Sequence, residues 1–158
     1  MPDPAAYERL LQVLLREERL LANLITLAHE EQLAIVHANY GEIERISALM
    51  EQAAEDMDTV AAEREALVAE IDTGQTLAEI AKAAETLGIR SLGRARRRLR
   101  AQMEVLRRAQ ETNARLILEA IRIRERWYGM LAGGVTATYG AAGQPELRRA
   151  RGLVSRSA

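Results

Sequence analysis

The sequence has no cysteine and few of the residues from which sheets are built. Its 158 residues include one Trp, four Tyr, no Phe and only 3 Pro. Without cysteine there is no disulfide framework and no Cys-ligated zinc or iron–sulfur site. A sheet core needs more aromatic and β-branched residues than the 17 Val and Ile found here. The composition is instead rich in Ala, Leu, Glu and Arg, which is typical of an all-helical protein.

Targeting and catalytic motifs are missing as well. Asp3 and Glu8 come before the first Arg and no basic segment leads an apolar one, so we expect no signal peptide and a cytoplasmic protein. No apolar run reaches the length of about 18 residues that a membrane span needs. Lys82 is the only lysine, no Gly-rich loop precedes it, and Gly-x-Ser-x-Gly does not occur. We therefore expect a protein that has no cofactor, is not an enzyme and does not insert into a membrane.

Three long heptad patterns predict three long helices. The apolar repeat runs from Tyr7 to Ile35, from Ile43 to Ile71 with an interruption only at Arg64, and from Leu92 to Trp127. Such a repeat is typical of helices that pack along a seam. Between the second and third patterns, a Thr76 and Glu79 capping box starts a short helix and Gly88 ends it. The predicted helices span about 4–38, 41–71, 76–87 and 91–131.

These helices predict the architecture. Long helices joined by short breaks pack antiparallel, so we expect an all-α fold, an elongated antiparallel three-helix coiled-coil-like bundle with a short extra helix. The bundle should span residues 1–131, and residues 132–158 should form a flexible C-terminal tail that binds partners. The sequence leaves the oligomeric state open.

Charge is divided along the chain although its sum is only −1. The first 88 residues carry 6 basic and 18 acidic side chains, a net charge of −12, and the last 70 carry 16 and 5, a net charge of +11. We expect the acidic flanks of the first two long helices to face the arginines of the last one. The excess on Arg148, Arg149, Arg151 and Arg156 would suit an acidic protein surface.

Two clusters of polar residues suggest other chemistry only weakly. Arg94, Arg96, Arg97, Arg98 and Arg100 would suit phosphates, but no aromatic residue lies among them for base stacking, and pairing with acidic helices is the favoured interpretation. We therefore expect no nucleic-acid partner. Neither His29 nor His37 has a Glu three residues before it, so the Glu-x-x-His motif of di-metal bundles is absent and no metal site is expected.

Asn113 occupies a position in the third heptad pattern where an apolar residue is usual. One buried amide in a helical seam fixes register at some cost in stability, so we predict a structural role for Asn113 rather than direct binding. The segment from Gly133 to Gly143 sets one Tyr among small residues, and Leu147 and Leu153 follow on an Arg-bearing stretch. A frayed end and a short docking peptide fit this segment equally well.

Taken together, these features resemble the FlgN-like flagellar export chaperones, and the resemblance covers nearly the whole chain. Its elements are the Leu and Glu repeat of the first helix, the break at 39–42, the stretch Glu63–Leu67, Asn113–Leu116 as an Asn-x-x-Leu motif, and Thr138-Tyr139-Gly140 with Gly143. The sequence departs from the family pattern in its arginines at 94–100 and in Asn39, where an Asp is common.

The resemblance implies a non-catalytic type III secretion chaperone. Such a protein binds the helical C-terminal region of an unassembled hook-associated protein, prevents its premature assembly and delivers it to the export gate. Tyr139 matches the gate-docking tyrosine of the family. From this motif we expect Tyr139, Gly140 and Gly143 to bind partners. The docking-peptide pattern adds Leu147, and an amphipathic client helix could pack on the apolar surface at Trp127, Met130 and Leu131.

Two alternatives stay open at this point. A structural coiled-coil protein would assemble with itself through the seam of the second helix. An RNA-binding helical protein would use the arginines at 94–100, and its binding would weaken steeply with salt.

Overall fold

The structure is a computed structural model that describes residues 4–133, 135–139 and 145–149. Its elements are α1 (Pro4–Val36), α2 (Tyr40–Ile71), α3 (Leu77–Thr86), α4 (Arg90–Gly133), β1 (Val135–Tyr139) and β2 (Pro145–Arg149). The predicted all-α bundle is confirmed, and every predicted helix is present with ends that differ by at most two residues. The two short strands were not predicted.

The chain divides into two compact units, the first ending at Leu116 and the second beginning at Ile117. The first unit holds α1, α2, α3 and the first part of α4. The second holds the rest of α4 and the two strands, which pair antiparallel with Val135 opposite Arg149 and Tyr139 opposite Pro145. The predicted division into a helical bundle of residues 1–131 and a flexible partner-binding tail of residues 132–158 stays a prediction.

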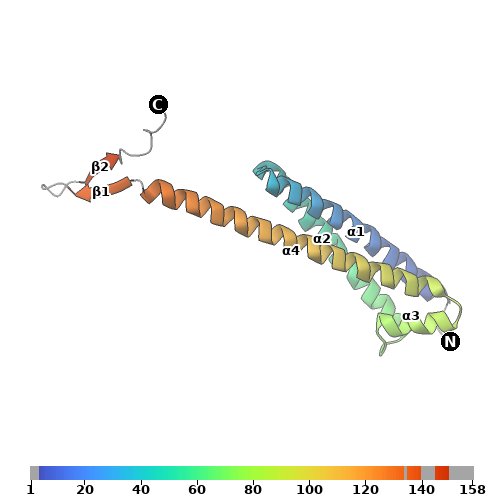
Figure 1. The fold of residues 1–158 in the computed structure, drawn as a ribbon. Helices are drawn as coiled ribbons and strands as arrows, with labels where there is room; N and C mark the ends of the chain where they lie inside the picture. The colour runs from blue at the N-terminus through green and yellow to red at the C-terminus, as the bar shows by residue number, and fades with distance from the viewer. Residues whose placement is uncertain (1–3, 134, 140–144, 150–158) are drawn as a thin grey trace. The chain divides into compact units, whose positions relative to one another are not determined.

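The α1 and α2 helices form an antiparallel hairpin (Figure 1). Ala38 ends α1 in the left-handed region with φ of 51°, and Asn39 then caps α2 by accepting a hydrogen bond from the Glu42 amide at 3.3 Å. A side-chain acceptor at this position satisfies one of the amides that the first helical turn leaves unpaired. Three residues, 37–39, separate the two helices.

Capping also fixes both ends of α3, as the sequence predicts. Thr76 Oγ1 accepts from the Glu79 amide, and the Glu79 carboxylate accepts from the Thr76 amide at 2.7 Å, which completes the capping box. The Thr76 amide and the Thr76 hydroxyl both donate to this carboxylate and lower the pKa of Glu79, because these bonds favour its charged form. Gly88, with φ of 85°, ends the helix and lets the Ile89 amide donate to the Ala84 carbonyl.

The core of the first unit consists of two clusters. The larger one joins all four helices where α1 begins, and its most buried large side chains include Leu10 and Leu14 of α1, Ile80 of α3 and Leu92 of α4. The smaller one joins Leu27 and Ala34 of α1 to Ile46 of α2. Each helix thus contributes apolar side chains from successive heptads on one face, and these faces pack together. Within the described residues, no helix is both long and apolar enough to cross a membrane.

Arg64, the one residue that interrupts the heptad pattern of α2, has a partner across the bundle. Its Nε donates to Glu17 Oε1 at 2.9 Å, and Glu17 is only 5% exposed. A buried carboxylate is unfavourable unless it is paired and hydrogen-bonded. The interruption in the α2 pattern is therefore matched by an acidic residue on α1.

We expect Arg64→Leu to lower the free energy of unfolding by about 1–3 kcal/mol, because it leaves the Glu17 carboxylate buried without its cation. The side chain of Arg64 is 26% exposed, so the loss is smaller than for a fully buried pair. The double variant Glu17→Leu/Arg64→Leu should return to within about 1 kcal/mol of the native protein. Urea denaturation measures both changes.

The control is Arg9→Leu, which removes the exposed pair of Arg9 with Glu70 and should change stability by less than about 1 kcal/mol. If the double variant lost as much stability as Glu17→Leu and Arg64→Leu lose in sum, Glu17 and Arg64 would not be coupled.

Candidate functional site

The candidate site is built on one face of α4. In the first unit, its side chains at alternating spacings of three and four residues are buried or half-buried: Leu92, Ala95, Leu99, Gln102, Leu106, Ala109, Asn113 and Leu116. We call this set the buried seam. The spacing is that of the a and d positions of a coiled coil, and the buried seam ends at the residue where the first unit ends.

α1 runs parallel to α4 along the buried seam. Arg98, which precedes Leu99, makes a two-pronged contact with Glu18 of α1: its Nε lies 2.8 Å from Glu18 Oε1, and its Nη2 donates to Oε2 at 3.1 Å. Further along both helices, Asn113 contacts Ala28 and Glu31 of α1. Because residue numbers rise together on the two helices, their directions are the same.

Asn113 lies at the end of this interface and is only 3% exposed. Its Nδ2 donates to the Ala28 carbonyl at 2.7 Å and to Glu31 Oε2 at 2.8 Å. Its Oδ1 is buried and has no hydrogen-bond partner among the described residues. An unsatisfied buried oxygen costs about 1–3 kcal/mol. Both hydrogen bonds join α4 to α1 at this point of the interface, and the structural role of Asn113 stays a prediction.

The same spacing continues in α4 beyond the first unit. Ala120, Ile123, Trp127 and Met130 follow Leu116 at steps of four, three, four and three residues, and all four are exposed. We call this set the exposed seam. Ile123 is 51% exposed, Trp127 59% and Met130 67%, and exposed Ile117 and Leu131 flank them. A cluster of large apolar side chains on one helical face is typical of a protein-binding surface.

The exposed seam contains two of the predicted partner-binding residues, Trp127 and Met130, and Leu131 lies beside it. Ile123 and Ile117 are exposed here but are not among the predicted partner-binding residues, although the heptad count already places Ile123 on this face. The sequence pattern does not reveal where burial ends, because the repeat runs through Leu116 without a change.

The other predicted partner-binding residues belong to the C-terminal segment. Tyr139 is the last residue of β1, and Leu147 lies in β2 opposite Ala137. Gly140 and Gly143 lie outside the described residues. The backbone thus places Tyr139 where the hairpin strand β1 ends, and the binding roles of these four residues stay predictions.

The arginines at 94–100 pair with the bundle only in part. Arg98 contacts Glu18 of α1, and Arg97 contacts Glu85 of α3 at 3.5 Å. For Arg94, Arg96 and Arg100, the part of the chain that the structure describes holds no ion pair. Among the described arginines at 94–100, the predicted pairing with the acidic flanks of α1 and α2 is therefore observed only for Arg98.

Other ion pairs join α1 to α2 or lie within α4. Arg16 of α1 contacts Glu63 of α2 at 2.7 Å, and Arg107 and Arg108 of α4 both contact Glu104 one turn away. These two arginines lower the pKa of Glu104 to about 2, because their hydrogen bonds favour the charged carboxylate. Exposed pairs of this kind add little stability.

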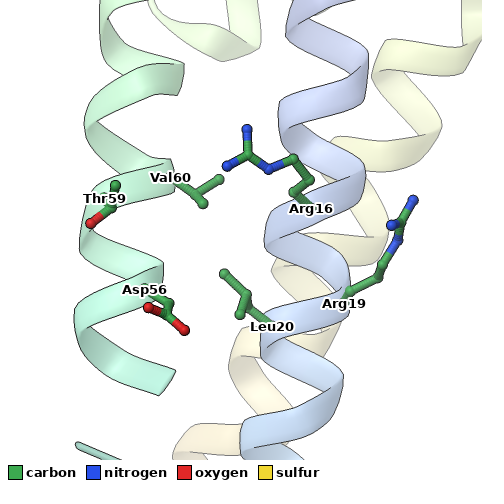
Figure 2. Close-up of a pocket in the computed structure, with 6 residues that line it drawn as sticks. All are labelled: Arg16, Arg19, Leu20, Asp56, Thr59 and Val60. Atoms are coloured by element: carbon green, nitrogen blue, oxygen red, sulfur yellow. The ribbon is translucent and has the colours of Figure 1, made fainter. Parts of the chain in front are cut away.

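A shallow hollow of about 380 Å³ lies between α1 and α2 (Figure 2). Figure 2 shows Leu20 of α1 and Val60 of α2 pointing toward one another across it. Three of its polar groups have neighbours as partners: Arg16 contacts Glu63, Asp56 accepts a hydrogen bond from Gln52 at 3.2 Å, and the Thr59 hydroxyl donates to the Glu55 carbonyl. The hollow therefore brings together no nucleophile, base and orienting group of the kind that catalysis needs.

The histidines take no part in a shared site. The His37 ring lies 2.7 Å from the Leu33 carbonyl of its own helix. Within the described ranges, no group of three or more His, Asp or Glu side chains is placed to hold a metal ion.

One comparison with known proteins gives a match. The sequence model described as "FlgN protein" matches residues 1–146, which is most of the chain. No curated protein and no solved structure matches this chain. The matched range includes the bundle, the exposed seam and β1.

We expect Asn113→Leu to raise the free energy of unfolding by about 1 kcal/mol, because it removes the unsatisfied Oδ1 and buries apolar surface in its place. Asn113→Ala should instead lower it, since the smaller side chain leaves a cavity beside Ala28. Urea denaturation of both variants checks the signs. A destabilised Asn113→Leu variant would show that the two hydrogen bonds to α1 outweigh the unsatisfied oxygen.

Proposed function

The chain belongs to the FlgN protein family, a family of flagellar export chaperones, and we propose that it acts in the cytoplasm on unassembled hook-associated proteins. In this proposal it binds them, prevents their premature assembly and delivers them to the gate of the flagellar type III export apparatus. The family match over residues 1–146 is the observation that carries the proposal.

The exposed seam supports client binding. A helix-in-groove interaction needs apolar anchors at spacings of three and four residues, and Ala120, Ile123, Trp127 and Met130 have that spacing. Trp is one of the residue types enriched at the energetic centres of interfaces. An amphipathic helix from a hook-associated protein would bury these side chains and, with them, its own assembly surface.

The C-terminal segment supports delivery to the gate. Tyr139 and Leu147 lie on the paired strands β1 and β2, and the segment from 132 onward carries the Thr-Tyr-Gly motif together with Arg148 and Arg149. We propose that Tyr139, Gly140, Gly143 and Leu147 contact the cytoplasmic domain of the export gate. A client on α4 and a gate on this segment would then occupy different residues.

A self-assembling coiled-coil protein is the alternative from another class. The exposed seam is also able to receive a second copy of the chain. Sedimentation of the purified protein separates the two functions, because a scaffold forms stable oligomers alone and a chaperone forms a defined complex with a hook-associated protein.

Deleting residues 132–158 should leave helicity nearly unchanged, because only the last two residues of α4 are removed. We expect binding of a hook-associated protein or of the export gate to weaken at least tenfold. Circular dichroism and titration calorimetry measure the two effects. Unchanged affinity for both partners would show that the C-terminal segment has no binding role.

Tyr139→Ala should reduce export of hook-associated proteins while the client complex persists, because the substitution removes the proposed gate contact and leaves the exposed seam intact. Secretion assays and co-purification report the two outcomes. Tyr128→Ala is the matched control, since Tyr128 is an exposed tyrosine of α4 outside the seam positions. Loss of the client complex in Tyr139→Ala would move the client site to the C-terminal segment.

A further inference from the structure

Arginines flank the buried seam and the exposed seam at equivalent positions. Arg98 precedes Leu99, and Arg126 precedes Trp127. Arg126 follows Arg98 by 28 residues, which is four whole heptads, so the two side chains occupy the same position of the repeat. Arg96 and Arg124 are related in the same way. Positions beside a coiled-coil seam govern the choice and orientation of the partner helix.

The contact of Arg98 shows what this position does when a helix covers the seam. Its guanidinium makes two contacts with the Glu18 carboxylate of α1, from Nε to Oε1 at 2.8 Å and from Nη2 to Oε2 at 3.1 Å. Paired contacts of this kind are directional and favour Arg over Lys. Glu18 lies between two buried leucines of α1, Leu14 and Leu21. The covering helix thus presents a carboxylate four residues after one apolar anchor and three before the next.

Arg126 has the same position but no such partner. Its side chain is exposed, and no ion pair joins it to another described residue. The same holds for Arg124, whereas Arg122, which lies off the seam, contacts Glu119 of its own helix at 2.7 Å. Among the described residues, the two arginines beside the exposed seam therefore have no ion pair, while Arg122 away from it has one.

We propose that Arg126 selects the helix that binds the exposed seam by pairing with a carboxylate on it. Resting on the proposed client binding, this inference specifies the client segment as an amphipathic helix that repeats the pattern of α1. In that client helix, two apolar anchors lie seven residues apart, and a Glu or Asp lies four residues after the first anchor. Arg124 on the other flank adds attraction for an acidic helix.

Charge favours a client helix over a second copy of this chain. The helical residues 117–133 carry three arginines and two glutamates, and the free arginines are those beside the seam. A second copy would bring a seam flanked by the same arginines, and its Glu18 is already bound to its own Arg98. An acidic amphipathic helix brings no like charge to the exposed seam, and it brings carboxylates that can pair with Arg126.

The test measures binding of the purified full-length chain to the full-length hook-associated proteins of the same bacterium. We expect Arg126→Glu to weaken binding of a client at least tenfold at low salt, and Arg126→Gln to weaken it less. Arg122→Glu is the matched control because it makes the same change in charge off the seam, and it should leave affinity within about threefold. Circular dichroism checks that all variants keep native helicity.

A charge reversal completes the experiment. Acidic residues in the client's amphipathic helices are changed to Arg one at a time, and one such change should restore binding to Arg126→Glu. Equal affinities of the native chain and Arg126→Glu, or equal losses in Arg126→Glu and Arg122→Glu, would overturn the role of Arg126 and leave client binding intact. A native chain that binds no hook-associated protein, or that forms only dimers, would overturn the proposed function and this inference with it.

Discussion

The length of α4 relative to its neighbours is the constraint on which the rest of the structure depends. α4 has 44 residues, whereas α1 has 33 and α2 has 32. Within the first unit, α1 runs parallel to α4 and contacts it at Arg98 and Asn113. Burial on this face ends at Leu116, and the repeat continues to Met130 with exposed side chains. One helix therefore contributes both to a stable core and to a surface that needs a partner.

Charge has different uses in the two parts of the chain. Inside the bundle, Glu17 with Arg64 and Glu18 with Arg98 tie α1 to its two neighbours at defined heights. Pairs of this kind contribute more to the choice of register than to the free energy of unfolding. Among the described residues, two ion pairs, Arg97 with Glu85 and Arg98 with Glu18, join the acidic first part of the chain to the basic last part.

The sequence alone predicts the helices well and the limits of the site poorly. Heptad spacing, the Thr76 capping box and Gly88 are local signals, and they place every helix end within two residues. The partner of Arg64 is not predictable from α2 alone, because it depends on which α1 residue lies opposite. The β1 segment Val-Thr-Ala-Thr-Tyr has the β-branched residues of a strand, but the glycines around it favoured a tail. Trp127 and Met130 are exposed whereas the equivalent positions up to Leu116 are buried or half-buried, and the repeat in α4 does not encode this change.

The three-residue turn between α1 and α2 also has a consequence for the order of folding. Loop closure costs little entropy when so few residues are fixed, and contacts between segments close in sequence form early. The small cluster of Leu27, Ala34 and Ile46 lies beside this turn and requires nothing from α4. We expect the α1–α2 hairpin to form on the emerging chain before α4 has been synthesised. Until α4 arrives, the nascent hairpin exposes the leucines of α1 that α4 later covers, so the protein itself passes through a stage in which its core needs protection.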